Sequence, residues 1–539
     1  MNSTIVAEPS PSPWSPLRHA VFRALWIAGL VSDFGAWMHQ VGEAWLMTSL
    51  SPSPLLVALI QSADSLAIFL FSLPGGALAD LFDRQRLAIV TQAWLLVTAL
   101  ALGLLTLSGA MTPWTLIGLS FLISIGAAVD GPVWQAIVPE VVPRKDLPQA
   151  VALGGVSINV ARAVAPALGG LVVAAAGPFA VFLLNAATFV YVIAVLVRWR
   201  PARTPTTPTL PREQLVGAVQ RGLRYVRNSP ELLAAFFRTG VALFAGSCLL
   251  ALLPVFARQE LSLESAGYGL LYGCMGVGAV LSMALLPNSP KRSPETTLTA
   301  GTIGFAIVLL ALAAARSPWL AAVAMLAGGV ASMSILTSLN VAVQVATPSW
   351  VRARVLSIYM IVYQGAIALG SIVWGALAAR TNLRIAFIAG GATMLVGGLA
   401  GRSWFRLGGR VPDLSPSLHW PKPVLVCEPT AEAGPVLVTV EYRVPPENVS
   451  SFIAAANRLQ RLRRRDGAYQ WEVFRDPSAP DRFLETYMVD SWADHLRQHE
   501  RTTVEQHDAE SRLRALVAAG TEPKVTHLIA ASADTASEA

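Results

Sequence analysis

The 539 residues of this chain are 54% hydrophobic and only 14% charged, and they carry a formal net charge of +7. Soluble domains carry about 25% charged residues, so this composition excludes an ordinary soluble protein and indicates a chain that folds in lipid. Most basic residues lie in short polar segments between apolar runs, which indicates membrane topology rather than nucleic-acid binding.

The chain begins with a polar segment, residues 1–20, which is followed by an apolar run from Val21 to Leu50. The apolar core of a signal peptide is roughly 7 to 15 residues long, so this run is too long for one and we expect it to remain as a membrane span. Further apolar runs of about 20 residues follow, which is the length that crosses a bilayer. The twelve expected spans lie near residues 21–49, 55–78, 87–108, 113–138, 150–175, 178–197, 232–257, 264–286, 297–315, 318–346, 353–378 and 383–402.

The expected spans form an N-terminal half, residues 21–197, and a C-terminal half, residues 232–402, joined by a basic loop at residues 198–231. Lys and Arg recur in every second loop. Loops rich in these residues face the cytoplasm, so we expect both termini there and a multi-pass protein of the bacterial inner membrane. The basic loop carries Arg200, Arg203, Arg212, Arg221, Arg224 and Arg227, and a later loop on the same side carries Lys291 and Arg292.

After the last span the composition becomes Pro-rich and then charged, which predicts a linker at residues 403–435 and a soluble domain at residues 436–530. Its pattern predicts the element order β-α-β-β-α-β, which is the ferredoxin-like unit. The predicted fold is therefore an all-α polytopic membrane protein with a C-terminal α+β ferredoxin-like domain. We expect residues 531–539 to be disordered. The predicted strands are residues 436–442, 468–474, 482–490 and 524–529, and the predicted helices are residues 446–465 and 491–516.

The string Gly-Ala-Leu-Ala-Asp-Leu-Phe-Asp-Arg-Gln-Arg at residues 76–86 falls between the second and third expected spans. A solvated loop explains any single charge there, but the whole string resembles motif A of the major facilitator superfamily. The resemblance implies a twelve-helix fold of two six-helix halves and a conformational latch made of charge-assisted contacts. In this superfamily the Asp would face the start of span eleven, and the first Arg would face the end of span four. The implied latch residues are Gly76, Asp80, Arg84, Arg86, Glu140 and Arg354.

A second string, Ala-Arg-Ala-Val-Ala-Pro-Ala-Leu-Gly-Gly at residues 161–170, lies in the fifth expected span. It resembles motif C, which marks antiporters, and so exporters, within the superfamily, although Ala165 stands where the motif usually has Gly. A proline bends the helix and paired glycines permit close packing against a neighbouring span, but an ordinary kinked helix gives the same pattern. The motif residues are Arg162, Pro166, Gly169 and Gly170.

Longer strings, at residues 32–38, 45–50, 137–140 and 159–162, resemble the transmembrane secretion effector branch, which is enterobactin-exporter-like. The resemblance implies a secondary active exporter of a small siderophore-like or drug-like molecule, working by proton-coupled antiport without a cofactor. No Gly-x-x-x-x-Gly-Lys-[Ser/Thr] loop that would indicate an ATP-driven pump appears in the sequence. The predicted tail also resembles dimeric αβ-barrel domains such as antibiotic-biosynthesis monooxygenases, so a membrane-tethered enzyme or a ligand sensor is the alternative.

Ionisable side chains inside apolar spans are costly, so they are candidate functional residues. Asp33 falls near the middle of its span and is the leading candidate for proton coupling, with Asp130 second and with Asp64 and Glu43 as further candidates. A structural ion pair, for example between Asp130 and Arg162, is the competing explanation. Neutral polar and aromatic side chains either line a substrate cavity or bond one helix to another. The cavity candidates are Trp37, Gln61, Gln135, Asn159, Gln344 and Tyr363.

The predicted tail carries two weaker signals. His495 and His499 have a metal-compatible spacing on a predicted helix, but no third ligand is evident in the sequence. We therefore expect a solvated helix face and no metal. We expect the arginines at residues 458, 461 and 463–465 on a cytoplasmic helix face, with attraction to anionic lipid headgroups as the alternative. The cysteines form neither a metal-ligand spacing nor a disulfide framework, and they are Cys248, Cys274 and Cys427.

The first predicted strand of the tail alternates apolar residues at Val438, Val440 and Tyr442. An open four-stranded sheet leaves one face uncovered, so we expect this apolar face to pair with the same face of a second copy of the chain.

Overall fold

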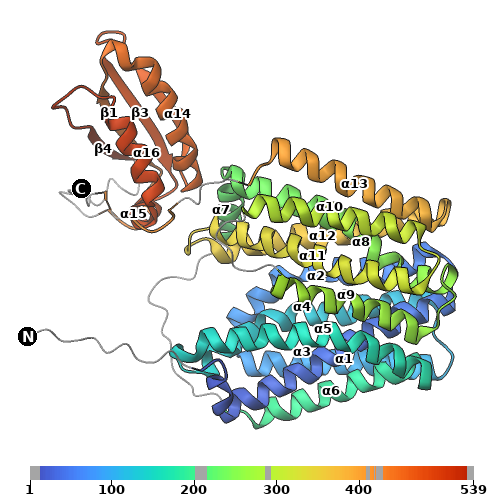
Figure 1. The fold of residues 1–539 in the computed structure, drawn as a ribbon. Helices are drawn as coiled ribbons and strands as arrows, with labels where there is room; N and C mark the ends of the chain where they lie inside the picture. Colours follow the sequence, from blue (N-terminus) through green and yellow to red (C-terminus); the bar gives the residue numbers. More distant parts are fainter. Residues whose placement is uncertain are drawn as a thin grey trace, which may run out of the picture. The chain divides into compact units, whose positions relative to one another are not determined.

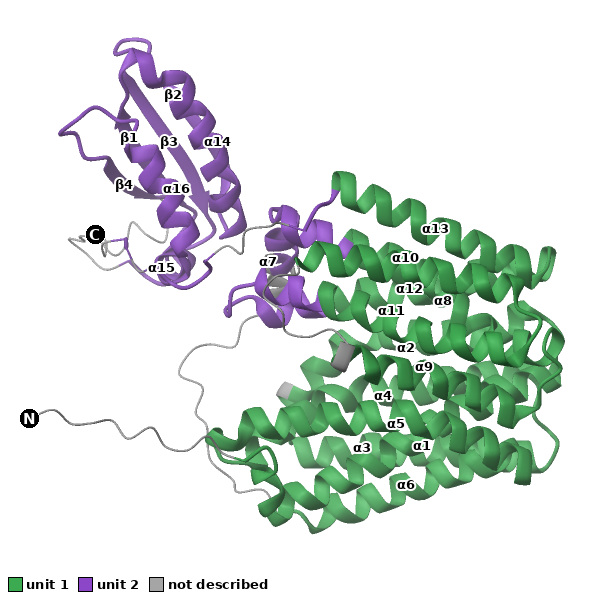
Figure 2. Cartoon of the chain, in the orientation of Figure 1, with its two compact units in different colours: residues 1–210, 237–339, 359–404 green, residues 211–236, 340–358, 405–539 purple. Residues whose placement is uncertain are grey.

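The computed structural model describes residues 12–200, 215–285, 293–407, 413–417, 419–420 and 429–530. The chain divides into two compact units, which Figure 2 colours separately. Unit 1 comprises residues 1–210, 237–339 and 359–404, and unit 2 comprises residues 211–236, 340–358 and 405–539. Several predictions lie outside the described residues: the first part of the N-terminal segment (1–11), much of the basic loop (201–214), Lys291, Arg292, Cys427 and the tail at 531–539.

The part of the chain that is described contains twelve helices long and apolar enough to cross a membrane (Figure 1), as the sequence predicts. The first half consists of α1 (Ala20–Leu50), α2 (Pro54–Leu81), α3 (Arg84–Leu107), α4 (Pro113–Val141), α5 (Leu147–Ala176) and α6 (Pro178–Arg198). The second half consists of α8 (Pro230–Gln259), α9 (Ser265–Leu285), α10 (Pro294–Ala314), α11 (Pro318–Val345), α12 (Arg352–Arg380) and α13 (Leu383–Trp404). The short helix α7 (Leu215–Arg227) lies between the halves in sequence, and single 3₁₀ turns occur at Ser15–Arg18 and Arg144–Asp146.

The ends and outer faces of these helices follow from local sequence. Several helices begin at a proline, which suits the first helical position because its missing N–H would have no helical partner there. Asp83 caps α3 by accepting a hydrogen bond from the backbone N–H of Arg86 at 2.9 Å. On α3 the exposed residues Val90, Val97 and Leu104 are seven apart, so they form one apolar stripe on the outside of the bundle. Such a stripe is suited to contact with lipid chains.

The C-terminal tail is a four-stranded antiparallel sheet covered by helices, as Figure 1 shows. Its elements are β1 (Val436–Arg443), a 3₁₀ turn (Pro446–Asn448), α14 (Val449–Arg465), β2 (Tyr469–Arg475), β3 (Arg482–Val489), α15 (Trp492–Arg501), α16 (Val504–Arg514) and β4 (Lys524–Ile529). The strand order β2-β3-β1-β4 and the chain order together are those of the ferredoxin-like unit. The sequence therefore predicted this fold correctly.

One predicted helix of the tail, residues 491–516, is two helices in the structure. Thr502 and Thr503 leave the helical conformation, and the Thr503 hydroxyl caps α16 by accepting from the backbone N–H of Gln506. The interruption has a partner, because Pro416 forms a β-bridge with Thr503. A segment of the expected linker therefore packs on the tail.

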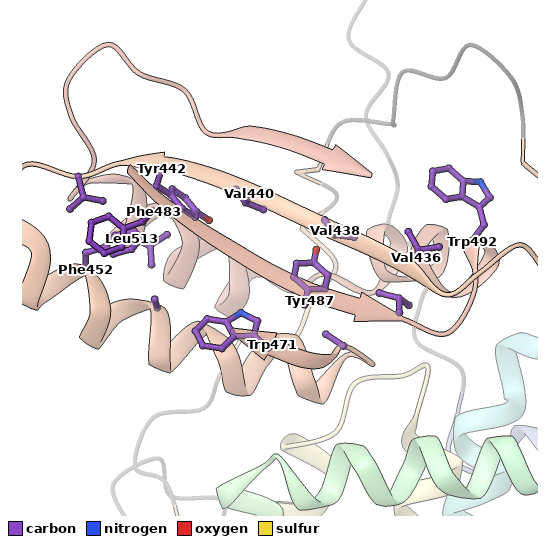
Figure 3. Close-up of a cluster of buried hydrophobic side chains, with 14 residues drawn as sticks. Val436, Val438, Val440, Tyr442, Phe452, Trp471, Phe483, Tyr487, Trp492 and Leu513 are labelled. Carbon is purple, nitrogen blue, oxygen red and sulfur yellow. The ribbon is translucent and has the colours of Figure 1, made fainter. Parts of the chain in front are cut away.

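The core of the tail lies between one face of the sheet and its helices (Figure 3). Val438, Val440 and Tyr442 point into this core, where they pack with Phe452 of α14 and Leu513 of α16. The expectation that these three strand residues form an open apolar face was wrong. Both crossover helices lie on one side of the sheet, and the face with the largest apolar side chains is the one they cover.

The opposite face of the sheet carries the other residues of each strand. In the strand register Leu437 lies beside Met488 on β3 and beside Leu528 on β4, and the three form an apolar group on this face. Leu484 continues the same face of β3 beside Phe474 of β2, and Phe474 and Leu528 are more than half exposed. The open face therefore carries other apolar residues than the three that the sequence indicated.

Unit 2 also joins the tail to α7 and to the connection between α11 and α12. The Arg224 guanidinium on α7 donates a hydrogen bond to the carbonyl of Gly467 at 2.8 Å. The Arg501 guanidinium lies 4.3 Å from the ring centre of Trp350. Arginine stacked on an aromatic face is favoured by the quadrupole of the ring, so these contacts stabilise the unit.

Candidate transport site

A cavity of about 770 Å³ opens among helices of the first half. All four predicted proton-coupling residues, Asp33, Glu43, Asp64 and Asp130, line it, although they come from three different helices. The sequence identified each as a candidate but not their common location. Four carboxylates in one cavity of a membrane bundle form a concentrated acidic site.

All four carboxylates accept a hydrogen bond from a hydroxyl of a neighbouring helix, and three of them have no histidine partner. A hydroxyl is the donor in each case, and it can also accept a hydrogen bond if the carboxylate takes up a proton. The contacts therefore suit either protonation state. They join Ser157 to Asp33 at 2.7 Å, Ser124 to Asp64 at 2.9 Å, and Thr91 to Asp130 at 2.9 Å, with the amide of Gln92 also donating to Asp130 at 3.1 Å.

Glu43 is bonded differently and introduces a residue that the sequence reasoning missed. Its Oε1 lies 3.0 Å from His39 Nε2 and accepts a hydrogen bond from the Ser120 hydroxyl at 2.8 Å. His39 is 3% exposed and Glu43 is 1% exposed, and both line the acidic cavity. A signal was present, because His and Glu four residues apart share one helix face. The cavity thus contains a histidine together with four carboxylates.

Arg162 does not pair with Asp130, contrary to the ion pair considered from the sequence. Its guanidinium lies 5.4 Å from the ring centre of Trp37 and lines a second cavity of about 190 Å³. The ring of Tyr272 packs edge-on to Trp37 with centroids 6.1 Å apart. Because Thr91 and Gln92 already bond the carboxylate of Asp130, that group is satisfied without a cation.

The second cavity is lined by helices of both halves, and it contains several of the predicted cavity residues. These are Trp37, Gln61 and Tyr363, and Arg162 of the motif C string lines the cavity with them. Gln135 lines the acidic cavity instead. Two candidates line neither cavity: Asn159 donates to the carbonyl of Gly155 in its own helix at 2.8 Å, and Gln344 donates to the side chain of Asn340. Both contacts lie within one helix, so these two residues neither line these cavities nor show the expected bond from one helix to another.

The glycines of the motif C string bring α5 into direct backbone contact with its neighbours. A Cβ atom added at Gly170 would lie 2.5 Å from the carbonyl oxygen of Ser265 on α9, and one at Gly169 would lie 2.9 Å from the Cα of Met38 on α1. Pro166 lies inside α5, and its carbonyl oxygen would lie 2.5 Å from a Cβ at Gly269. The glycines thus bring α5 and α9 into close contact and join the two halves, while the exporter role that the motif implies stays a prediction.

The motif A string contains one observed ion pair. Arg84 pairs with Glu140 at the end of α4, as the resemblance implies, and it also donates to the carbonyl of Ala136 at 3.2 Å. Arg86 is exposed, and Gly76 has open space where a Cβ would be. The side chain of Asp80 lies outside the described residues, and Arg354 belongs to unit 2, where it packs against Gly222 of α7. The latch function stays a prediction.

The halves also meet through α1 and α8. Arg258, near the end of α8, donates hydrogen bonds to the hydroxyls of Thr48 at 3.1 Å and Ser49 at 2.8 Å. Its guanidinium lies 5.6 Å from the ring centre of Trp45, and that ring stacks on Tyr268 of α9. These contacts link the ends of α1 and α8 that lie far from the basic loops in sequence.

Comparison with known proteins decides the family. The family model described as "Transmembrane secretion effector" matches residues 11–535, which is nearly the whole chain. The chain belongs to the transmembrane secretion effector family of the major facilitator superfamily.

Curated relatives of this transporter include siderophore transporters. It is 26% identical to the staphyloferrin A transporter of Staphylococcus aureus over 265 residues, which cover 48% of this chain and 64% of that protein. It is 25% identical to the enterobactin exporter EntS of Shigella boydii over 390 residues, which cover 70% of this chain and 90% of that protein. The chain is thus a secondary transporter related to siderophore exporters, and the tail is an additional domain.

Solved structures confirm the fold of the transporter's membrane part. A POT family transporter in complex with 5-aminolevulinic acid matches with a TM-score of 0.60 at 13% identity, over 71% of this chain and 96% of that one. A bacterial homolog of the human lysosomal transporter Spinster, in an inward-facing conformation, matches with a TM-score of 0.56 at 14% identity, over 71% and 94%. At these identities the likeness shows the fold alone.

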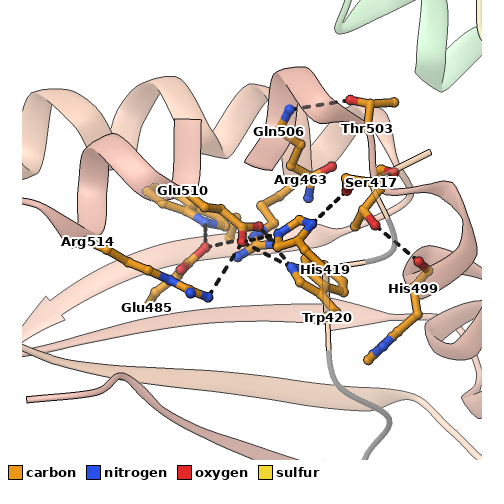
Figure 4. Close-up of polar contacts among 12 residues, drawn as sticks. Ser417, His419, Trp420, Arg463, Glu485, His499, Thr503, Gln506, Glu510 and Arg514 are labelled. Carbon is orange, nitrogen blue, oxygen red and sulfur yellow. Dashed lines mark hydrogen bonds and ion pairs between the residues drawn. The ribbon is translucent and has the colours of Figure 1, made fainter. Parts of the chain in front are cut away.

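The transporter's tail has a buried charged centre that the sequence did not indicate (Figure 4). Arg463 was expected to be solvated, but it is 5% exposed. Its Nε donates to Glu485 at 3.2 Å and its Nη1 donates to Glu510 at 2.8 Å. Arg465 is buried as well, with Glu505 as its partner at 2.8 Å. Both arginines were mistaken for surface residues because their carboxylate partners lie on other elements.

The linker completes this charged centre. His419 Nε2 lies 2.9 Å from Glu510, and the indole N–H of Trp420 donates to the same carboxylate at 3.1 Å. Burial alone would raise the pKa of Glu510, but the charge of Arg463 and these hydrogen bonds lower that pKa to about 2. Glu510 is therefore ionised at neutral pH.

Proposed function

We propose that this chain exports a small organic molecule, siderophore-like or drug-like, from a bacterial cell by alternating access, and that inward proton movement drives the export. One observation carries the proposal: unit 1 contains two different cavities. The first lies within one half and is acidic, and the second is shared by both halves and presents a cation and aromatic rings. The names of the relatives, a staphyloferrin A transporter and an enterobactin exporter, support the substrate class. The loop charges support an inner-membrane protein with both termini in the cytoplasm.

The second cavity suits a molecule with both an anionic and a planar apolar part. Within the described chain the Nε of Arg162 is buried without a hydrogen-bond partner. An unused donor beside Trp37 and Tyr363 would pair with a carboxylate or a similar anion, while the rings would contact a flat group. Ligand cavities usually measure about 300 to 1,000 Å³. The second cavity, at about 190 Å³, is smaller than this, so an extended ligand would need both cavities or a more open conformation.

Proton coupling is assigned to the acidic cavity, with Asp33 as the leading residue and Asp130 as the second. Asp33 lies near the middle of α1, where alternating access would expose it to each side of the membrane in turn. Its partner Ser157 donates to the carboxylate and would accept from the protonated form. The hydrogen bond between the Ser157 hydroxyl and Oδ2 of Asp33 can therefore persist when the carboxylate gains or loses a proton. His39 with Glu43 is a second titratable pair in the same cavity.

Two sets of contacts would favour opposite conformations in this mechanism. Close packing of α5 on α9, with the contacts of Arg258, would hold one side of the protein closed. The motif A region, including Arg84 and Glu140, would hold the cytoplasmic side closed in the other conformation. Asp80→Asn is expected to leave the protein in the membrane but to abolish most transport. Near-normal efflux by a well-expressed Asp80→Asn variant would exclude the latch.

The test of the coupling assignment uses purified protein in vesicles, with the substrate taken from extracellular metabolite profiles of a deletion strain and its complemented parent. Asp33→Asn is expected to abolish uphill transport driven by a pH gradient while retaining substrate binding and downhill exchange. Asp130→Asn serves as the comparison in the same cavity. Uphill transport by Asp33→Asn with unchanged pH dependence would exclude Asp33 and leave Asp130 to be tested. Equal secretion of all metabolites by the two strains would contradict export itself.

The tail is proposed to pair with the tail of a second chain through its open sheet face. The ferredoxin-like order resembles dimeric αβ-barrel domains, and Leu437, Met488 and Leu528 form an apolar group on that face. Leu528→Glu is expected to reduce chemical cross-linking of the full-length protein in detergent. Ile453→Glu, at an exposed site on α14, is the matched control. Equal cross-linking of both variants and the wild type would exclude this face as the interface. An enzymatic or ligand-sensing tail is the alternative function.

A further inference from the structure

Three histidines of the tail meet at one place. His495 and His499 lie one turn apart on α15, and His527 lies on β4, at the edge of the sheet. Within the described chain, one nitrogen atom from each of the three rings can be chosen so that all three lie within 4.8 Å of one another. The sequence showed the pair on the helix but not the third histidine, which the pairing of β4 with β1 brings beside them. The expected solvated face was wrong, because His495 is 1% exposed.

The spacing of one pair of nitrogen atoms matches the requirements of a metal site. A tetrahedral zinc ion binds imidazole nitrogens at about 2.0–2.1 Å, which places two such nitrogens roughly 3.3 Å from each other. Nε2 of His499 lies 3.3 Å from Nε2 of His495. The ring centres of His495 and His527 are 4.6 Å apart, and the chosen nitrogen atoms of the three rings lie within 4.8 Å of one another, so His527 would have to move closer to complete a tetrahedral set.

The surroundings hold the three rings in place and keep them uncharged. The ring of Trp492 packs against His495 and His527, with centroids 5.3 and 6.1 Å apart. Burial, with smaller contributions from His527 and His499, lowers the pKa of His495 to about 3, and burial also lowers the pKa of each of the other two. Neutral imidazole is the form that binds a metal, so a cation would displace no proton from these rings at neutral pH.

The charge of the nearby arginine does not prevent cation binding. Arg463 acts on His495 and His499 from a distance, but the carboxylates of Glu485 and Glu510 already neutralise it.

We propose that His495, His499 and His527 bind one divalent transition-metal ion of the zinc class in the tail domain. Three imidazoles without a carboxylate suit Zn²⁺, Cu²⁺ or Ni²⁺ and do not suit Ca²⁺ or Mg²⁺, which require oxygen ligands. A fourth position would be left for water or a small anion. The competing explanation is a hydrogen bond from one imidazole to another, held by packing against Trp492, and it predicts no bound ion.

Such an ion would stabilise the tail by tying its edge strand to α15. Without it, β4 contacts β1 along a single edge, and Val525 and Leu528 are about half exposed. An ion that binds only the folded form shifts the equilibrium toward that form. Hydrogen exchange in β4 is therefore expected to slow when the ion is added, whether or not the transporter is active.

The experiment uses the full-length protein, without a polyhistidine tag, purified in detergent and treated with a chelator. Zn²⁺ alone is titrated and the bound ion is counted by mass spectrometry, and Co²⁺ alone is added to detect the visible absorption of a tetrahedral site. One equivalent per chain is expected, with slower exchange in β4. His507→Gln, at an exposed histidine of α16, is the matched control and should bind as the wild type does.

His527→Gln and His499→Gln test the site, because both side chains are only partly buried and are safer to replace than His495. Removing a hydrogen-bond partner of a metal ligand weakens metal binding about 10- to 100-fold. Removing a ligand itself is therefore expected to weaken Zn²⁺ binding by more than about 100-fold. Unchanged exchange elsewhere in the tail shows that a variant is folded. The proposal is wrong if the wild type binds no Zn²⁺ ion tightly and shows no tetrahedral Co²⁺ spectrum. It is also wrong if a folded His527→Gln or His499→Gln variant binds Zn²⁺ as the wild type does.

Discussion

Glu510 is the residue of the tail whose replacement has the most predictable consequence. Its carboxylate is almost fully buried, and it accepts from Arg463, Trp420 and His419. Burial opposes its ionisation, but these partners lower its pKa from 4.5 to about 2. Each unit corresponds to about 1.4 kcal/mol, so the ionised group stabilises the folded tail by about 3 kcal/mol at neutral pH.

Glu510→Gln keeps the shape of the side chain but removes this charge. At neutral pH the tail is expected to lose about 3 kcal/mol of its free energy of unfolding, which corresponds to roughly 100-fold faster hydrogen exchange in β1 and α16. Peptide-resolved exchange in the full-length protein measures this without disturbing the membrane helices. Glu522→Gln, at an exposed glutamate of the same tail, is the matched control. If exchange is unchanged in Glu510→Gln, or is equally accelerated in Glu510→Gln and Glu522→Gln, the ionised Glu510 does not stabilise the tail as inferred.

Further predictions concern the membrane part and the pH dependence of the tail. Gly170→Val is expected to lower substrate efflux severalfold at equal membrane abundance, because its side chain would clash with α9, whereas Gly155→Ala on the same helix has open space and should be tolerated. Arg258→Gln removes contacts between the halves. In this variant an impermeant maleimide is expected to label a cysteine placed beside α1 more rapidly. Arg316→Gln should leave that labelling unchanged, because its ion pair with the end of α8 lies within one half. The pKa of Glu510 is depressed on folding, so its contribution is complete above about pH 4.5 and is lost as the pH falls toward 2. Exchange in the wild-type tail should therefore approach that of Glu510→Gln over this range, after correction for the intrinsic rate.

The membrane fold follows from the sequence because the bilayer imposes a one-dimensional requirement. A span must satisfy its own backbone hydrogen bonds over about 20 residues, so hydropathy along the chain is sufficient to locate all twelve helices. The ferredoxin-like order follows for a similar reason, since alternation and turn signals are local. The ion pair of Arg84 with Glu140 could be expected only because the motif A string resembles a known superfamily.

The sites depended on contacts between elements that lie far apart in the chain. Periodicity shows which face of a helix is apolar but not which helix it meets, so Arg162 could not be assigned to Trp37 rather than to Asp130. The location of four carboxylates in one cavity, the burial of Arg463, and the arrival of His527 beside two helical histidines have the same origin. In each case the sequence supplied the chemical groups, and packing of the helices and pairing of the strands decided which groups meet.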